Sequence, residues 1–301
     1  MTDELARFHL EPDDGYAGAV TLDRTAVGRV SVALQRTRSA VVRRGPRRAI
    51  TGSVPLHNAY ALTWDMEASN DLPTMRTILE ALCDAQSALI VPGGHEWTLN
   101  ASDKGARTFS SWTATEDGLS HRLRGGICKE VSLSINTGSI AAIASTWEFL
   151  TCEEVVEETA DTTSSADRWA GGVDCHASWG GQDLTAWAVA LNFSRDMSVG
   201  DIDDVGVARG YTGRPAVDIA GRLVGRISGE DAAELFRSDS TRELKISLYA
   251  GSAKMVITLH RVTFMITARR VVGNGQIEHT IEFVATAGTG LPTATVSLVQ
   301  S

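Results

Sequence analysis

Long apolar segments and cysteines are both scarce in this 301-residue sequence. The longest uninterrupted apolar run, Ala186–Leu191, has six residues, whereas a membrane-spanning helix needs about 18 or more. The segment MTDELARFHL at the N-terminus has no apolar core, so we expect neither a secretory signal nor a membrane partner. The four cysteines contain no CxxC pair and are too few for a disulfide scaffold. We expect reduced thiols that pack as small apolar side chains.

Motifs that carry catalysis or hold cofactors are missing as well. The sequence contains no GxSxG elbow, no HExxH pair, no GxxxxGK[ST] loop and no strand–GxGxxG–helix segment. Carboxylate pairs such as Asp13–Asp14 and Asp203–Asp204 lie in polar stretches without aromatic neighbours, unlike the paired acids of a glycosidase cleft. We therefore predict no enzymatic activity, no cofactor and no metal site.

The charge is negative overall and unevenly distributed. With 28 Lys+Arg against 37 Asp+Glu, the net charge of −9 opposes general binding of nucleic acid. Residues 1–150 hold 15 basic and 17 acidic groups, and residues 171–301 hold 12 and 14. Residues 151–170 hold one basic and six acidic groups, with many Thr, Ser and Gly nearby. This pattern predicts a first domain over 1–152, an acidic linker over 153–172 and a second domain over 173–301.

Both halves show the period-two alternation of half-buried antiparallel strands. Val131–Ile135 in the first half and Leu244–Leu248 in the second alternate apolar with polar or small residues. Each half also has one helical pattern, over about 70–84 and 228–237, with apolar residues at spacings of three and four behind capping residues. The predicted fold class is mainly β, with two tandem β-sandwich or barrel domains of similar plan, each with one flanking α-helix.

The order of elements also repeats. Val30–Leu34 resembles Trp187–Leu191, and Lys129–Thr151 resembles His260–Thr286, each pair in the same order around an Arg-Gly dipeptide and a helix. A tandem duplication explains this order. Two unrelated β-domains with similar alternation remain the alternative.

One segment departs from the even distribution of charge. Residues 36–48 hold six arginines and no acid, and Gly45-Pro46 predicts a loop. The segment lacks the interleaved aromatics of single-strand binders, so a contact with another subunit competes with a solvated loop and a nucleic-acid arm. The acidic connector offers complementary carboxylates. The candidate intersubunit residues are Arg36, Arg38, Arg43, Arg44, Arg47 and Arg48, with Glu153, Glu154, Glu157, Glu158 and Asp161.

Seven tryptophans could stack against sugars, but most lie in alternating strands, where we expect them to fill a core. They are Trp64, Trp97, Trp112, Trp147, Trp169, Trp179 and Trp187.

Three segments together resemble the tail tube proteins of long-tailed phages, in the type with a duplicated domain. They are Gly125–Phe149, its later counterpart Leu259–Ala287, and the loop and strand Gly206–Gly225. The resemblance extends from about residue 15 to the end and consists of alternation and turn placement. The arginine-rich segment and the acidic connector are departures from it.

The resemblance implies a structural virion protein that forms rings, stacked into a hollow tube through which the phage DNA leaves without specific binding. Because a ring of this family holds six such domains, a duplicated chain implies three chains per ring. It also implies tape-measure, tail-terminator and baseplate or distal tail proteins as partners, and the virion tail as location after assembly in the host cytoplasm. The alternatives are a β-sandwich carbohydrate-binding module of a phage or bacterial surface, and a β-rich hydrolase.

Overall fold

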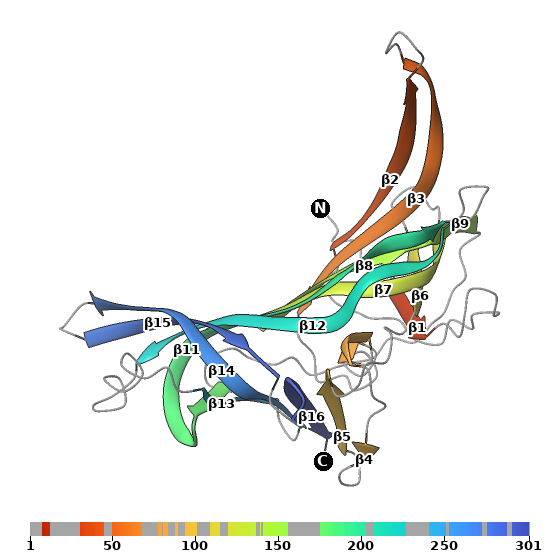
Figure 1. Cartoon of the computed structure of the whole chain (residues 1–301). Coiled ribbons are helices and arrows are strands. Elements are labelled where there is room, and N and C mark those ends of the chain that lie inside the picture. The colour runs from red at the N-terminus through yellow and green to blue at the C-terminus, as the bar shows by residue number, and fades with distance from the viewer. Residues whose placement is uncertain are drawn as a thin grey trace, which may run out of the picture.

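The computed structural model describes residues 8–12, 31–44, 50–67, 78–79, 81–83, 88–89, 94–100, 109–114, 120–136, 139, 141–155, 175–202, 208–226, 241–250, 253–272, 276–287 and 291–300. Almost all of these residues are in β-strands (Figure 1). In the first half the strands are β1 Phe8–Pro12, β2 Ser31–Arg44, β3 Ile50–Glu67, β4 Ala88–Leu89, β5 Gly94–Leu99, β6 Phe109–Ala114, β7 Ser120–Asn136, β8 Ala142–Phe149 and β9 Thr151–Val155. In the second half they are β10 Cys175–Trp179, β11 Gln182–Ile202, β12 Ala208–Arg226, β13 Arg242–Ala250, β14 Ala253–Val272, β15 Gln276–Ala285 and β16 Ala294–Gln300.

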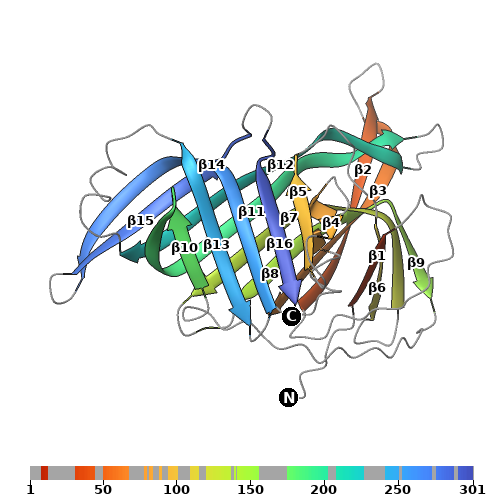
Figure 2. The same cartoon turned by 90° about the horizontal axis from the view of Figure 1, so that it is seen from below.

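The strands form one antiparallel network, which confirms the mainly β prediction. Its longest path runs β2-β3-β8-β7-β11-β10-β13-β14-β16-β5-β4, with β1, β6, β9, β12 and β15 paired alongside it. Strands of the two halves are neighbours at β7–β11 and at β5–β16. Figure 2 shows the strands side by side, with β16 between β14 and β5. The division into two domains stays a prediction.

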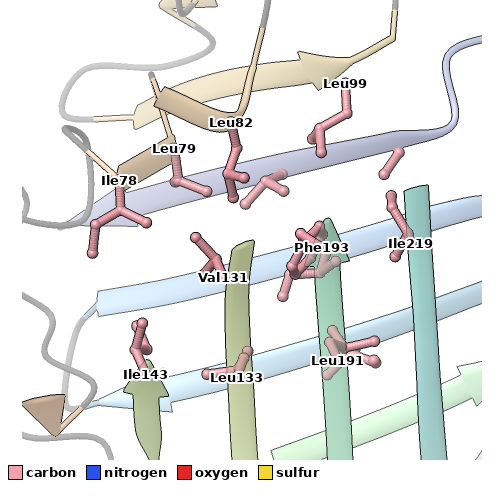
Figure 3. Close-up of a cluster of buried hydrophobic side chains, with 14 of the residues drawn as sticks. Ile78, Leu79, Leu82, Leu99, Val131, Leu133, Ile143, Leu191, Phe193 and Ile219 are labelled. Atoms are coloured by element: carbon pink, nitrogen blue, oxygen red, sulfur yellow. The ribbon is translucent and has the colours of Figure 1, made fainter. Parts of the chain in front are cut away.

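The core lies on one face of the central strands. In β7, the buried Val131, Leu133 and Ile135 alternate with half-buried Ser132 and Ser134, as the sequence predicts. Figure 3 shows Val131 and Leu133 beside Leu191 and Phe193 of β11, with other strands crossing over them. The expected packing of tryptophans is confirmed at three positions, since Trp97, Trp147 and Trp179 are at most 1% exposed.

A short helical segment covers this face. Residues 78–79 and 81–82 are helical, and the Cys83 amide donates to the Leu79 carbonyl at 2.8 Å, the i to i−4 bond of an α-helix. Ile78, Leu79 and Leu82 point toward Val131 and Phe193 (Figure 3). These residues fall within the helix predicted over 70–84, so that prediction is confirmed for its described part. The helix predicted over 228–237 lies outside the described residues.

The prediction of a loop over 36–48 is wrong for most of its length. Arg36, Arg38, Arg43 and Arg44 lie in β2, which pairs with β3 from Ser31↔Asp65 to Arg44↔Ile50 in a long hairpin that projects from the rest of the molecule (Figure 1). The residues between the arginines include Thr37 and Val41-Val42, and such β-branched residues favour a strand. Gly45-Pro46 follows the last residue of β2 and so marks the end of a strand.

The start of the predicted acidic linker is also a strand. Glu153 and Glu154 lie in β9, opposite Arg122 and His121 of β7. The concentration of acidic residues, with Thr, Ser and Gly nearby, predicts a linker from residue 153 onward. In the structure, basic partners lie directly across from Glu153 and Glu154, which stabilises this part as a strand. None of the four cysteines is in a disulfide.

Candidate assembly surface

The two halves share six strand pairs in the same arrangement, and the second half adds a short β10–β11 pair without a described counterpart in the first. In the first half, the pairs are β2–β3, β3–β8, β8–β7, β7–β6, β6–β1 and β7–β9. In the second, they are β11–β12, β12–β15, β15–β14, β14–β13, β13–β10 and β14–β16. Each half thus contains a four-stranded path that begins with a long hairpin, β2–β3 or β11–β12, and ends at β7 or β14.

The end of the first path is joined to the start of the second. The C-terminal part of β7, Glu130–Asn136, pairs with Ala188–Ser194 of β11. On one face of this junction, Val131, Leu133, Val189, Leu191 and Phe193 are all at most 4% exposed. The opposite face presents small and polar residues, which are Ser132, Ser134, Ala190 and Asn192. The junction therefore continues both faces of the sheet from one half into the next.

A buried arginine anchors the helical segment of the first half to the second half at this junction. Arg195 on β11 is 4% exposed, and its Nη1 and Nη2 donate to the carbonyls of Ala81 and Leu82 at 3.1 and 2.8 Å. Carbonyls at the C-terminal end of a helix have no partner within the helix and carry partial negative charge. A guanidinium satisfies two of them at once, which stabilises the contact between the halves.

Other polar contacts join the halves beside the junction. The Tyr211 hydroxyl lies 2.5 Å from the Gly125 carbonyl and 2.6 Å from the Glu148 carbonyl. The Glu148 carboxylate accepts a bond from Lys129 at 2.9 Å and from the Val199 amide at 3.4 Å.

Asn100, directly after β5, makes a second set of contacts between the halves. Its side-chain amide donates to the Val217 carbonyl at 2.7 Å and accepts from the Val217 amide at 2.8 Å. It also donates to the Thr293 hydroxyl at 3.0 Å, next to the β5–β16 pair. Asn100 has φ of 57°, a left-handed conformation that asparagine tolerates well.

Among the described residues, the outer ends of the path have open edges. β2 pairs only with β3, and residues 263–272 of β14 pair only with β15. The equivalent part of β7 pairs with β8 on one edge and β11 on the other. Exposed apolar side chains collect at this open part of β14, where Met265 is 65% exposed and Val271 is 72% exposed. Ile277, the register partner of Val271, is 40% exposed.

The structure separates the predicted contact residues into two places. Arg36, Arg38, Arg43 and Arg44 lie in β2, and Glu153 and Glu154 lie in β9, with no pairing between those two strands in the described part of the chain. The Glu153 carboxylate is 3.9 Å from Arg124 of its own chain, which lies in the N-terminal part of β7. Arg47, Arg48, Glu157, Glu158 and Asp161 lie outside the described residues. An intersubunit role for these groups stays a prediction.

The sequence interpretation missed Arg195, Tyr211, Asn100 and the open edge of β14. For Arg195, the sequence does contain a signal. The segment Val189–Arg195 reads VALNFSR and Val32–Arg38 reads VALQRTR, so the similarity noted for VSVAL and WAVAL continues to an arginine in both halves.

The described part of the chain gives less support to a metal site, a membrane-spanning helix or a sugar-binding site than to an assembly surface. It contains no group of three or more metal-ligating side chains and no helix long and apolar enough to cross a membrane. A hollow of about 630 Å³ lies over the small-residue face, lined by residues such as Asn192, Arg222 and Glu282. The aromatic ring in its lining, Phe283, is 2% exposed, and Trp97 and Trp179 are likewise buried. Sugar stacking needs an exposed aromatic face, which none of these three residues offers.

No family model matches the sequence, and no curated protein matches it either. The junction, the open edges and the resemblance in the sequence are the features that bear on the function.

Proposed function

We propose that this chain is the structural subunit of a phage tail tube. Its halves are tandem tail-tube-like β-domains, 1–152 and 173–301, each with one flanking helix. Each chain adds the open edge of β14 to β2 of the next chain, three chains close a ring, and the rings stack into a hollow tube for DNA ejection.

The observation that carries the proposal is the β7–β11 junction. It joins two copies of one pairing pattern, head to tail, within a single chain. The same pattern leaves β2 and the C-terminal part of β14 open at the outer ends. A head-to-tail contact that repeats by rotation produces a closed ring. The exposed Val271 and Ile277 support this contact, because apolar groups of this size at an open strand edge favour association.

Strand geometry supports a channel of suitable width. The path β2-β3-β8-β7-β11-β12-β15-β14 gives eight strands per chain. Three chains would give 24 strands, with a circumference of about 115 Å at roughly 4.8 Å spacing. A strand tilt of about 40° gives a backbone diameter of roughly 48 Å, and some 35–40 Å would remain open inside the side chains. A DNA duplex passes through such a channel without being gripped.

The face opposite the core is the better candidate for the wall of the channel. At the junction it carries Ser132, Ser134, Ala190 and Asn192, which are small and uncharged. The acidic Glu130 and Glu282 and the basic Arg222 line the hollow near them, so negative charge is in slight excess there. A wall without clustered cations cannot retain DNA by counterion release.

In this proposal the protein acts in the virion tail, after assembly in the host cytoplasm. Its partners would be further copies of itself, a tape-measure protein inside the tube, and tail-terminator and baseplate or distal tail proteins at the ends. No membrane contact is required.

The test is the assembly state of the purified protein over a range of concentrations. Sedimentation velocity should resolve a species of three 32.2-kDa chains, about 97 kDa, and negative-stain images should show rings or tubes with an open centre. Replacing Val271 and Ile277 together by lysine should leave a folded monomer that forms neither rings nor tubes. The matched control replaces Leu291, which is also exposed, by lysine, and this variant should still assemble. A chain that remains monomeric at every concentration would overturn the proposal.

A further inference from the structure

The outer part of the β11–β12 hairpin packs on a short segment of the first half. The Val199 amide donates to the Glu148 carboxylate at 3.4 Å, and the Tyr211 hydroxyl lies 2.6 Å from the Glu148 carbonyl. Leu150, directly after β8, is 4% exposed and packs in a small apolar cluster with Val199 and Tyr211. Glu148 and Leu150 thus form a first receiving site, which accepts a hairpin from the other half.

The second half contains a counterpart of this segment. WEFL holds Glu148 and Leu150, and IEFV of β15 holds Glu282 and Val284 at the same positions. The strand pairing agrees with the sequence. Glu148 and Glu282 each lie six residues after the first residue of their strand that pairs with β7 or β14, respectively. Glu282 and Val284 therefore form the second receiving site by sequence and by position in the sheet.

The second receiving site is open, unlike the first. Glu282 is exposed and Val284 is half-buried, whereas Glu148 and Leu150 are largely covered. Glu282 and Val284 line the hollow of about 630 Å³, together with the exposed Met265 of β14. Glu282 also lies opposite Ile266, in the part of β14 whose other edge is open. The second receiving site is therefore at the place where the proposed ring brings in another chain.

The β2–β3 hairpin has the place in the first half that β11–β12 has in the second. Each is the long hairpin that begins a four-stranded path, and β2–β3 projects from the rest of the molecule (Figure 1). The β11–β12 hairpin reaches Glu148 with a main-chain amide, so an equivalent contact needs only the backbone of the incoming hairpin. Within the described residues, the chain offers one projecting hairpin and one open receiving site.

We infer that the second receiving site binds the β2–β3 hairpin of a second copy of this chain. Glu282 accepts a hydrogen bond from a main-chain amide of that hairpin, and the hairpin covers Val284, as β11–β12 covers Glu148 and Leu150 within the chain. The inference rests on the proposed ring. It adds a contact on the face of β15 to the pairing of strands at the edge of β14.

The first test compares Glu282→Ala with Glu278→Ala. Both changes remove one carboxylate from β15, four residues apart, but Glu278 does not line the hollow and lies 4.0 Å from the exposed Arg270. Sedimentation velocity gives the concentration at which half of the chains are in rings. Glu282→Ala should raise it by about tenfold or more, the effect of losing one hydrogen bond of a charged group. Glu278→Ala should leave it within about threefold, because an exposed ion pair contributes little.

The second test locates the partner by photo-cross-linking. Arg222 lies opposite Glu282 on β12 and is exposed at the hollow. With p-benzoylphenylalanine in its place, irradiated rings should yield a covalent dimer whose cross-linked peptide falls within residues 31–67 of the second chain. The same group in place of Arg226, which is exposed four residues further along β12 and does not line the hollow, should yield no such dimer.

The two tests separate the possible failures. Thermal unfolding of the dilute monomer should be the same for wild type and all variants, which excludes misfolding. If wild type forms rings and Glu282→Ala forms them equally well, or if the cross-link from position 222 falls outside residues 31–67, the hairpin contact is refuted while the ring stands. If wild type forms no rings, the proposed function fails and the hairpin contact fails with it.

Discussion

Replacing Arg195 by methionine tests the contact between the halves within one chain. Methionine fills much of the same volume but donates no hydrogen bond. The change removes two bonds of a charged group, at 3.1 and 2.8 Å, from a residue that is 4% exposed. Each such bond contributes about 1.5–3 kcal/mol, and the apolar side chain recovers part of the loss. We expect the free energy of unfolding to fall by about 3 kcal/mol.

This loss corresponds to a measurable shift in melting temperature. At about 2.1 cal/mol/K per residue, 301 residues give an unfolding entropy of about 0.6 kcal/mol/K near 60 °C. A loss of about 3 kcal/mol then lowers the melting temperature by about 5 °C if the described sheet unfolds as one unit. Circular dichroism of the dilute monomer measures this shift. Hydrogen exchange at the Cys83 amide, which donates to Leu79, should also become faster.

Arg226→Met is the matched control, because Arg226 is exposed at the end of β12. It should change the melting temperature by less than about 1 °C. A shift of Arg195→Met no larger than that of the control would refute the proposed contribution of Arg195. So would full retention of stability in Arg195→Lys, since lysine cannot bridge both carbonyls in the same way.

Four further outcomes are expected. Asn100→Ala should lower the free energy of unfolding in urea by about 2–3 kcal/mol, because it leaves the Val217 amide and carbonyl without these partners. Asn100→Asp keeps the acceptor for the Val217 amide, so its free energy of unfolding should fall by less. Burial raises the pKa of the Cys128 thiol to about 12, so the folded state holds its proton more tightly than the unfolded state. Stability should therefore fall as the pH rises above about 9, with a slope of up to about 1.4 kcal/mol per pH unit for this group, and Cys128→Ala should reduce that slope. Reversal of Arg43, Arg44, Arg47 and Arg48 to glutamate should block the stacking of rings while leaving single rings intact in negative stain, and stacking of wild type should weaken toward 1 M salt; long tubes of the variant at ordinary salt would contradict this. Purified protein should hydrolyse no common glycan, ester or nucleotide substrate, and any turnover above a mock preparation would contradict that prediction.

Local pattern was enough to predict the strands whose two faces differ. Val131–Ile135 and Leu244–Leu248 alternate in sequence, and their apolar residues are buried in the structure. Ile78, Leu79 and Leu82 have helical spacing, and the described part of that segment is helical. In these segments the period of the apolar residues and the secondary structure follow from the same local geometry.

The contacts between the halves could not be predicted in this way. Arg195 bonds to residues more than 110 positions away, and Asn100 bonds to Val217 at a separation of 117. Isolated arginine and asparagine residues are usually exposed, so nothing in their immediate sequence indicates burial. The arginine-rich strand could not be predicted for a related reason. Gly45-Pro46 indicates a loop, but the pairing of β2 with β3, which involves residues distant in sequence, outweighs that signal.

The two long hairpins have a consequence for the symmetry of any ring this chain forms. The last two residues of β2 are Arg43 and Arg44, and Arg47 and Arg48 follow soon after in the sequence. By contrast, Asp201 lies at the end of β11, and Asp203 and Asp204 follow that strand directly. Around a ring of three chains, basic and acidic tips would therefore alternate at six positions. The backbone of such a ring would have approximate sixfold symmetry, whereas its charge distribution would have only threefold symmetry. If one ring rotates against the next by one domain, each basic tip takes the place of an acidic tip and each acidic tip takes the place of a basic one. A rotation by two domains restores the original arrangement of basic and acidic tips. Fusing two domains into one chain thus halves the number of equivalent angular settings between stacked rings, from six to three.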